Sequence, residues 1–113
     1  MFYLVTEGNR ELWIAYESMA GQIYVYVPDT GRYHRNRGVA RDYYGERELN
    51  YAPLSAADVR AIMRDARVGR LDATRKRAQL DQYRADAHAL EPDEVLRSLK
   101  NMEEEGGGNV GDR

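Results

Sequence analysis

The densest group of anion-binding side chains in this sequence lies in residues 32–41, RYHRNRGVAR. The segment places four arginines around one histidine: Arg32, Arg35, Arg37 and Arg41 around His34. Guanidinium groups match phosphate oxygens in a bidentate geometry, and aromatic rings such as that of Tyr33 stack on unpaired bases. The pattern therefore indicates a possible nucleic-acid-binding segment. It is also typical of an exposed turn whose arginines pair with nearby acids such as Asp42 and Glu46.

A second basic cluster, Arg75-Lys76-Arg77, stands in the third quarter of the chain. Together with Arg64, Arg67 and Arg70 it could form a stripe along a phosphate backbone. However, positive charge near a helix N-terminus opposes the helix dipole. The same region carries acids spread along it: Asp65, Asp72, Asp81 and Asp86. A mixed-charge exposed face is therefore the alternative interpretation.

Side chains for catalysis or metal binding are few. The sequence has no Cys and only two histidines, His34 and His88, neither of which has a metal-ligand spacing. It contains no phosphate-binding loop and no dinucleotide fingerprint, so we expect no cofactor and no metal. RNA cleavage needs only a base, an acid and cations for the phosphate. Residues of the kinds that could supply these three groups occur between positions 34 and 48: His34, Arg35, Arg37, Glu46 and Glu48.

Composition narrows the class of protein. The chain has 113 residues, 17 basic and 19 acidic, with a formal net charge of −2. The charge is uneven, because residues 32–77 hold 12 basic residues against 6 acidic ones. The length suits a single domain over residues 1–102, and the acidic, glycine-rich residues 103–113 are predicted to be disordered. No long apolar run or export signal is present, so we expect a cytoplasmic location and no membrane partner.

The elements that must position these side chains begin with a predicted antiparallel β-meander over about residues 2–34. Four segments are rich in β-branched and aromatic residues: Phe2–Thr6, Glu11–Glu17, Gln22–Pro28 and Arg32–His34. Closing the breaks as short hairpin loops predicts three cross-strand pairs: Val5 with Leu12, Tyr16 with Ile23, and Val27 with Tyr33.

That register predicts the two faces of the sheet. One face is apolar throughout: Tyr3, Val5, Leu12, Ile14, Tyr16, Ile23, Val25, Val27 and Tyr33. The other has an aromatic centre: Phe2, Leu4, Trp13, Ala15, Tyr24, Tyr26 and His34. An antiparallel sheet with one wet face would alternate apolar with polar residues there. Either a helix covers the aromatic face or a partner binds it.

After the meander we expect a short helical turn capped by Asn36 and an extended segment at residues 49–54. In residues 55–102 the apolar residues then recur at helical spacing. Ser55 and Asp58 form a capping box for a helix that we expect to stop near Gly69. A second helix is predicted from Asp72 to about Leu90, and a third from Pro92. The sequence thus predicts an α+β fold, a three- to four-stranded antiparallel meander followed by two or three helices.

The sequence favours a non-enzymatic interaction or regulatory module. The partner, another protein or a second copy of the chain, would bind the aromatic face through Trp13, Tyr24, Tyr26 and His34. A heptad-like seam could add helical self-association: Leu80, Tyr83, Ala87 and Leu90. The alternative is nucleic-acid binding through residues 32–41 with help from residues 70–77. A small ribonuclease is the third possibility.

Overall fold

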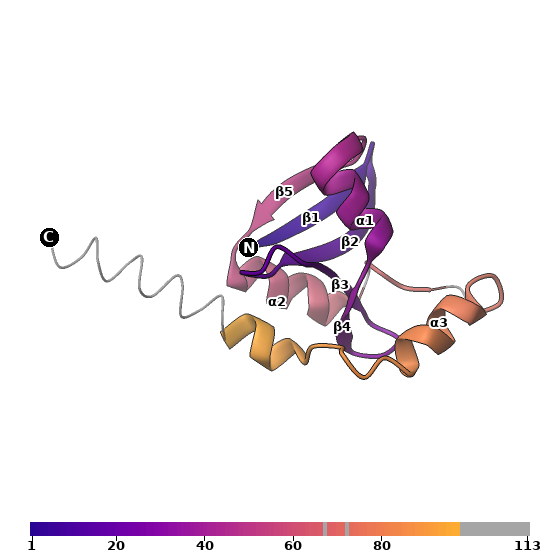
Figure 1. Ribbon diagram of the computed structural model, residues 1–113. Coiled ribbons are helices and arrows are strands. Elements are labelled where there is room, and N and C mark those ends of the chain that lie inside the picture. The colour runs from indigo at the N-terminus through magenta and orange to yellow at the C-terminus, as the bar shows by residue number, and fades with distance from the viewer. Residues whose placement is uncertain (67, 72, 98–113) are drawn as a thin grey trace, which may run out of the picture.

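The computed structural model describes residues 1–66, 68–71 and 73–97 (Figure 1). Its centre is one antiparallel sheet of five strands in the order β4-β3-β2-β1-β5. The strands are β1 (Phe2–Glu7), β2 (Arg10–Glu17), β3 (Ile23–Val27), β4 (Arg32–Arg35) and β5 (Asn50–Leu54). The first four strands form the predicted meander, which confirms the α+β fold. The extended segment at 49–54 becomes β5 and returns to pair with β1.

Short helices surround the sheet: α1 (Arg37–Arg41), the π-helix η1 (Asp42–Glu46), α2 (Ala56–Asp65) and α3 (Arg77–Arg84). Residues 92–97 are also helical. Two predicted caps are confirmed. The Asn36 side chain accepts a hydrogen bond from the backbone N–H of Val39 at 2.9 Å, and Ser55 and Asp58 form the expected capping box.

The predicted register is wrong by one residue at every hairpin of the meander. In the first hairpin the turn at Gly8-Asn9 is as expected, but a β-bulge at Leu12 shifts the pairing so that Val5 faces Trp13. In the second, Ser18 and Gln22 continue the ladder, so Tyr16 pairs with Tyr24. In the third, the loop closes after Val27, which pairs with Arg32.

The observed register changes which side chains lie on each face of the sheet. One face carries the larger aromatic cluster and packs against α2 and helix 92–97: Phe2, Leu4, Ile14, Tyr16, Tyr24, Tyr26 and Tyr33. The other carries Val5, Ala15, Val25, Val27 and His34 and packs against α1 and α3. Figure 1 shows α1 and α2 on opposite sides of the sheet. Both faces are therefore covered by helices.

The helical predictions need two corrections. The helix that begins after Ser55 is expected from the sequence to stop near Gly69. It ends earlier, at Asp65, because Ala66 adopts the left-handed conformation with φ of 51°. Of the helix expected over residues 72–90, the described residues are helical at Arg77–Arg84, whereas the predicted cap Asp72 lies outside the described residues and Leu90 makes a β-bridge with Tyr33. Leu80 and Tyr83 are buried within the chain, so the predicted seam does not form one exposed helical face.

Residues 98–113 lie outside the described part of the chain. The predicted disordered segment 103–113 belongs to them, and so do Leu99 and Met102 of the last predicted helix. Within the described residues, none of the helices is long and apolar enough to cross a bilayer.

Candidate functional site

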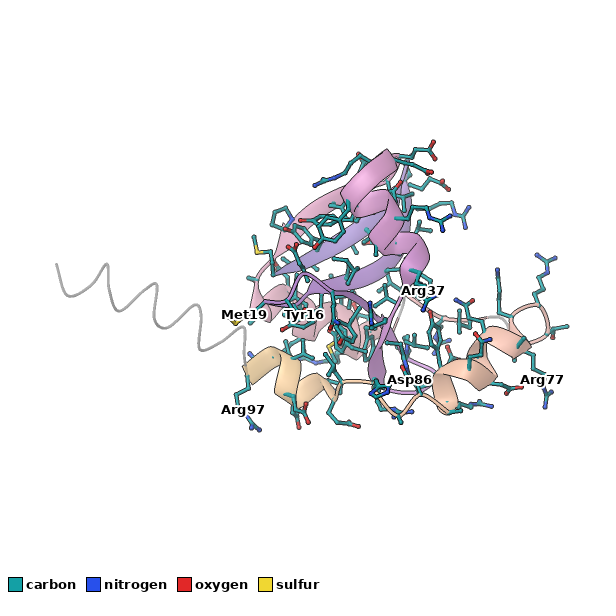
Figure 2. All side chains as sticks on the ribbon, viewed as in Figure 1. Tyr16, Met19, Arg37, Arg77, Asp86 and Arg97 are labelled. Atoms are coloured by element: carbon teal, nitrogen blue, oxygen red, sulfur yellow. The ribbon has the colours of Figure 1, made fainter. Side chains whose placement is uncertain are left out.

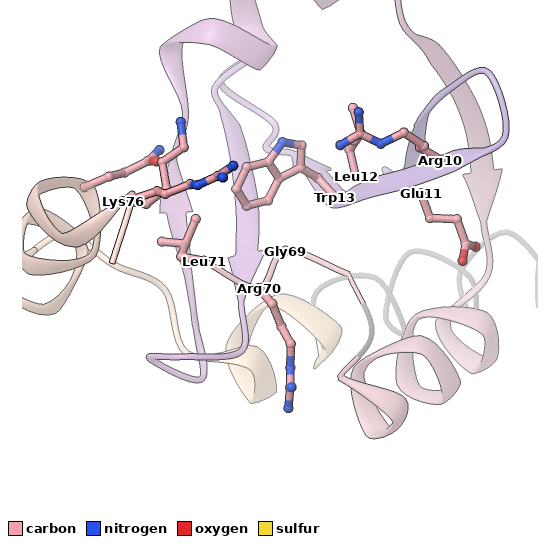
Figure 3. A pocket seen from close by; sticks show the side chains of 10 residues that line it. Arg10, Glu11, Leu12, Trp13, Gly69, Arg70, Leu71 and Lys76 are labelled. Carbon is pink, nitrogen blue, oxygen red and sulfur yellow. The ribbon is translucent and has the colours of Figure 1, made fainter. Parts of the chain in front are cut away.

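A solvent-open cleft of about 530 Å³ lies between β2, residues 69–71 and the start of α3. Four of its ten lining residues are cationic and one is acidic: Arg10, Arg70, Arg75, Lys76 and Glu11. The indole of Trp13 lies in the middle of this lining, between Lys76 and Arg10, while the Arg70 side chain points away from it (Figure 3). We call this feature the Trp13 cleft. It combines an aromatic surface with an excess of positive charge.

Residues 69–71 close one side of the Trp13 cleft because the backbone of Gly69 packs directly on the sheet. The Gly69 N–H donates to the carbonyl oxygen of Leu12 at 3.0 Å. A Cβ at Gly69 would collide with the carbonyl oxygen of Tyr26 and would lie 3.3 Å from Cε3 of Trp13. The loop is held from the other end by Leu71, whose N–H donates to the Asp29 carboxylate at 3.0 Å. Only glycine permits this close approach.

A second hollow, of about 400 Å³, lies between the start of α1 and α3. It is lined by Arg35, Asn36, Arg37, Gly38, Gln79, Gln82 and Tyr83. Figure 2 shows Arg37 next to α3. The Tyr83 hydroxyl joins the two elements, because it accepts hydrogen bonds from the side-chain amides of Asn36 and Gln79, each at 3.2 Å.

Gln79 lines both the second hollow and the Trp13 cleft, so the two adjoin along α3. Four cationic residues flank α3 in this way, and we call them the basic strip: Arg35, Arg37, Arg75 and Lys76. The strip joins residues from both basic clusters of the sequence. Arg77 is not part of it, because its side chain projects away from the sheet and lies 4.0 Å from Asp81 (Figure 2).

His34 is fully buried and has partners at both ring nitrogens. Its Nε2 lies 2.7 Å from the Thr30 hydroxyl, and its Nδ1 lies 3.0 Å from Oδ2 of Asp86. The imidazole also stacks on Tyr83, with ring centroids 4.5 Å apart. This hydroxyl–imidazole–carboxylate chain resembles a nucleophile activated by a base. Here, however, the imidazole has no exposed surface, and the chain joins β4 to the segment after α3.

Burial lowers the pKa of His34, against the opposing effects of the hydrogen bond and the negative charge of Asp86; the nearby Arg32 lowers it further. For Asp86, desolvation raises the pKa, but the bonds from His34 and from the His88 backbone outweigh it, and the net shift is downward. The pair therefore favours a neutral imidazole beside an ionised carboxylate.

Arg32 has a structural partner rather than a free guanidinium. Its two terminal nitrogens donate to three backbone carbonyl oxygens at the C-terminal end of α3: Tyr83 at 3.4 Å, Arg84 at 3.3 Å and Asp86 at 3.3 Å. Carbonyls at a helix C-terminus lack intrahelical partners and carry partial negative charge. Arg32 therefore satisfies α3 and holds it to β4.

The structure separates the other predicted site residues. Tyr24 and Tyr26 are buried in the core, so they do not form an exposed surface with Trp13, which remains partly exposed. Arg41 lies in the last turn of α1 and does not line either hollow described above.

The residues proposed for RNA cleavage are not gathered in one place. His34 is on β4 at one edge of the sheet, whereas Glu46 and Glu48 precede β5 at the other edge. The ligand atoms of these two glutamates lie within 4.8 Å of each other and of a carboxylate oxygen of Asp42. Both oxygens of Asp42 already accept hydrogen bonds: Oδ1 from Glu48 N–H at 2.8 Å, and Oδ2 from Leu49 N–H at 3.1 Å and the Tyr51 hydroxyl at 2.7 Å.

Comparison of the chain with models of protein families, with curated protein sequences and with solved structures gave no significant match. Sequence reasoning missed Gly69 and Gln79, which form and join the two hollows. A glycine just before a basic cluster could have pointed to a close approach, but nothing local in the sequence marks Gln79.

Proposed function

We propose that the protein binds nucleic acid through the basic strip along α3. The observation that carries the proposal is that Gln79 lines both hollows, so the hollow that holds Arg35 and Arg37 adjoins the cleft that holds Arg75 and Lys76. The acidic total of the chain does not oppose this, because a polyanion responds to the local potential of the surface that it approaches.

The balance of charge on this surface favours a polyanion. Among the described residues that line the two hollows, Glu11 is the acidic one, against six basic residues: Arg10, Arg70 and the four of the strip. Arginine dominates the set, and its planar guanidinium binds phosphate oxygens through two parallel hydrogen bonds. Gln79 lines both hollows and Gln82 lines the second, and their amides add uncharged donors for phosphate or sugar oxygens.

Binding of this kind has a characteristic salt dependence. If all four strip residues contacted phosphates of a single strand, the logarithm of the association constant would fall against the logarithm of salt concentration with a slope of about −2.8. Removing two of the four would reduce that slope to about −1.4.

The experiment measures fluorescence anisotropy of a labelled 20-nucleotide single strand between 25 and 200 mM salt, concentrations at which such slopes are resolved. Two variants test the two ends of the strip, R35A/R37A and R75A/K76A. The matched control is R60A/R97A, which removes two exposed arginines that lie together on α2 and helix 92–97. We expect each strip variant to raise Kd at least about tenfold at low salt and the control less than about twofold.

Two results would overturn the proposal. The first is no detectable binding of single- or double-stranded DNA or RNA by the wild-type protein at the lowest salt. The second is an equal loss of affinity in the strip variants and in R60A/R97A, which would show a response to net charge rather than to this surface.

A further inference from the structure

The Trp13 cleft has features that phosphate binding alone does not require. We infer that it stacks one unpaired base of the bound strand against the indole of Trp13, so that the protein prefers single-stranded to double-stranded nucleic acid. This inference rests on the proposed function and specifies the form of nucleic acid that the basic strip binds.

The indole of Trp13 is placed where a base could reach it. Trp13 is partly exposed and lies at the centre of the cleft lining, flanked by Arg10 and Lys76 (Figure 3). Its Cε3 would lie only 3.3 Å from a Cβ at Gly69, so the loop comes close to the ring on one side. The ring is thus held by the fold while part of it stays accessible, so stacking on it requires little loss of side-chain freedom. An aromatic platform of this kind accepts any base, because every base has a π-face.

The lining of the Trp13 cleft has an apolar part and a cationic part. Leu12 and Leu71 join Trp13 to make the apolar part, while cations line the same cleft at Arg75 and Lys76. A nucleotide has the same division, with a flat, weakly polar base and a charged phosphate. The volume of about 530 Å³ lies within the range of small-ligand sites and is large enough for one base.

Stacking on the indole of Trp13 would select against a duplex. In a double helix the faces of the bases are stacked on one another and unavailable, so only edges and phosphates can be reached. A duplex would contact the cations of the basic strip but could not use the indole. Stacking is worth about 1–3 kcal/mol per base, which corresponds to a preference of about fivefold or more for the single strand.

The chain carries its own reporter, because Trp13 is its one tryptophan. The experiment titrates the wild-type protein with three ligands: a 12-nucleotide thymidine strand, a strand of the same length with abasic sites throughout, and a 12-base-pair duplex, which has twice as many phosphates as either strand. Emission from Trp13 and Kd are measured together. We expect the thymidine strand to quench Trp13 strongly, and the abasic strand and the duplex to bind at least about fivefold more weakly with little quenching.

A Trp13→Leu variant then tests the role of the ring by anisotropy. It should lose most of the preference for thymidine over the abasic strand while keeping the salt dependence that the strip confers. If that variant does not fold, the quenching of the wild-type protein still decides the question.

The outcomes separate the two proposals. Equal affinity for the thymidine and abasic strands, with salt-dependent binding and no quenching, would overturn base stacking but leave nucleic-acid binding by the basic strip intact. Binding of none of the three ligands at low salt would overturn both.

Discussion

The Nδ1 atom of His34 lies 3.0 Å from Oδ2 of Asp86, although 52 residues separate them. The contact ties β4 to the segment that follows α3. Because α3 carries one side of both hollows, this buried pair helps to set where the basic strip stands relative to the sheet. Its protonation state therefore bears on the site as well as on stability.

We expect stability to fall as the pH is lowered from about 6.5, the ordinary pKa of histidine. The pKa of His34 is lower in the folded chain than in the unfolded chain, so the unfolded state binds more protons in this window. The stabilising contribution is therefore complete above the unfolded pKa and is lost as the pH drops toward the folded value. Urea unfolding between pH 4.5 and 8 measures this. In His34→Gln the change between pH 7 and pH 5 should shrink, whereas an unchanged profile would contradict the assignment.

Replacing Arg32 should destabilise the fold without reducing the charge of the basic strip. Arg32→Ala removes three hydrogen bonds to carbonyls at the end of α3, although the Tyr83 carbonyl keeps the N–H of Asp86, and we expect a loss of about 1–3 kcal/mol in the free energy of unfolding. Arg32→Lys should recover only part of this, because an ammonium lacks the guanidinium fork. Thermal unfolding measures the effect. Arg35→Ala is the matched control: Arg35 is exposed, so its loss should change nucleic-acid affinity and leave stability within about 0.5 kcal/mol.

Asp42→Asn should destabilise the connection between η1 and β5. The Asp42 carboxylate is buried and accepts three hydrogen bonds, two of them from backbone N–H groups at Glu48 and Leu49. An amide keeps the shape but presents one acceptor oxygen, so at least one buried donor loses its partner, at a cost of about 1–3 kcal/mol. Chemical denaturation at pH 7 tests this, and wild-type stability in the variant would contradict it.

The Asp42 carboxylate should also cause a second loss of stability at acid pH. Burial raises the pKa of Asp42, but its hydrogen bonds outweigh this and the net shift is downward from 3.8. Stabilisation is present above that value and disappears as the pH falls through the folded pKa. In Asp42→Asn the acid limb below pH 4 should be shallower than in the wild type. Because Asp86 shifts in the same direction, part of the limb should remain.

Gly69→Ala should cost far more than alanine at another glycine with positive φ. At Gly69, φ is 79° and a Cβ would strike the Tyr26 carbonyl, whereas at Gly31, φ is 69° and the space is open. Gly31→Ala therefore carries only the conformational cost of about 1 kcal/mol, and Gly69→Ala should exceed about 2 kcal/mol and shift the emission of Trp13. Thermal unfolding and tryptophan fluorescence of both variants make the comparison. Equal costs would show that the loop moves freely away from the sheet.

The features that the sequence predicted correctly are local ones. The strands of the meander follow from β-branched and aromatic runs, and the caps at Asn36 and Ser55 follow from side chains that bond to backbone three residues away. The register failed because a bulge at Leu12 and the conformation of two loops each shift pairing by one residue. Such shifts depend on backbone geometry that residue types alone do not specify.

The candidate site, too, has features that the local sequence reveals and features that depend on long-range contacts. Both basic clusters are visible in the sequence because charge composition is local. Their union is not, because it depends on α3 lying beside the start of α1, where Tyr83 bonds to Asn36, 47 residues away. The shorter α3 has a similar cause. Leu90 leaves the helical path to bond with the backbone of Tyr33, and a long-range contact of this kind overrides helical spacing.

The bridge between Tyr33 and Leu90 also protects the sheet. The two residues exchange backbone hydrogen bonds of 2.9 and 2.8 Å, which occupy part of the outer edge of β4. At the opposite edge, β5 is only five residues long and contains Pro53, which has no N–H to offer a further strand. Among the described residues, neither edge presents a long row of free donors and acceptors, an arrangement that disfavours pairing with strands of other copies of the chain.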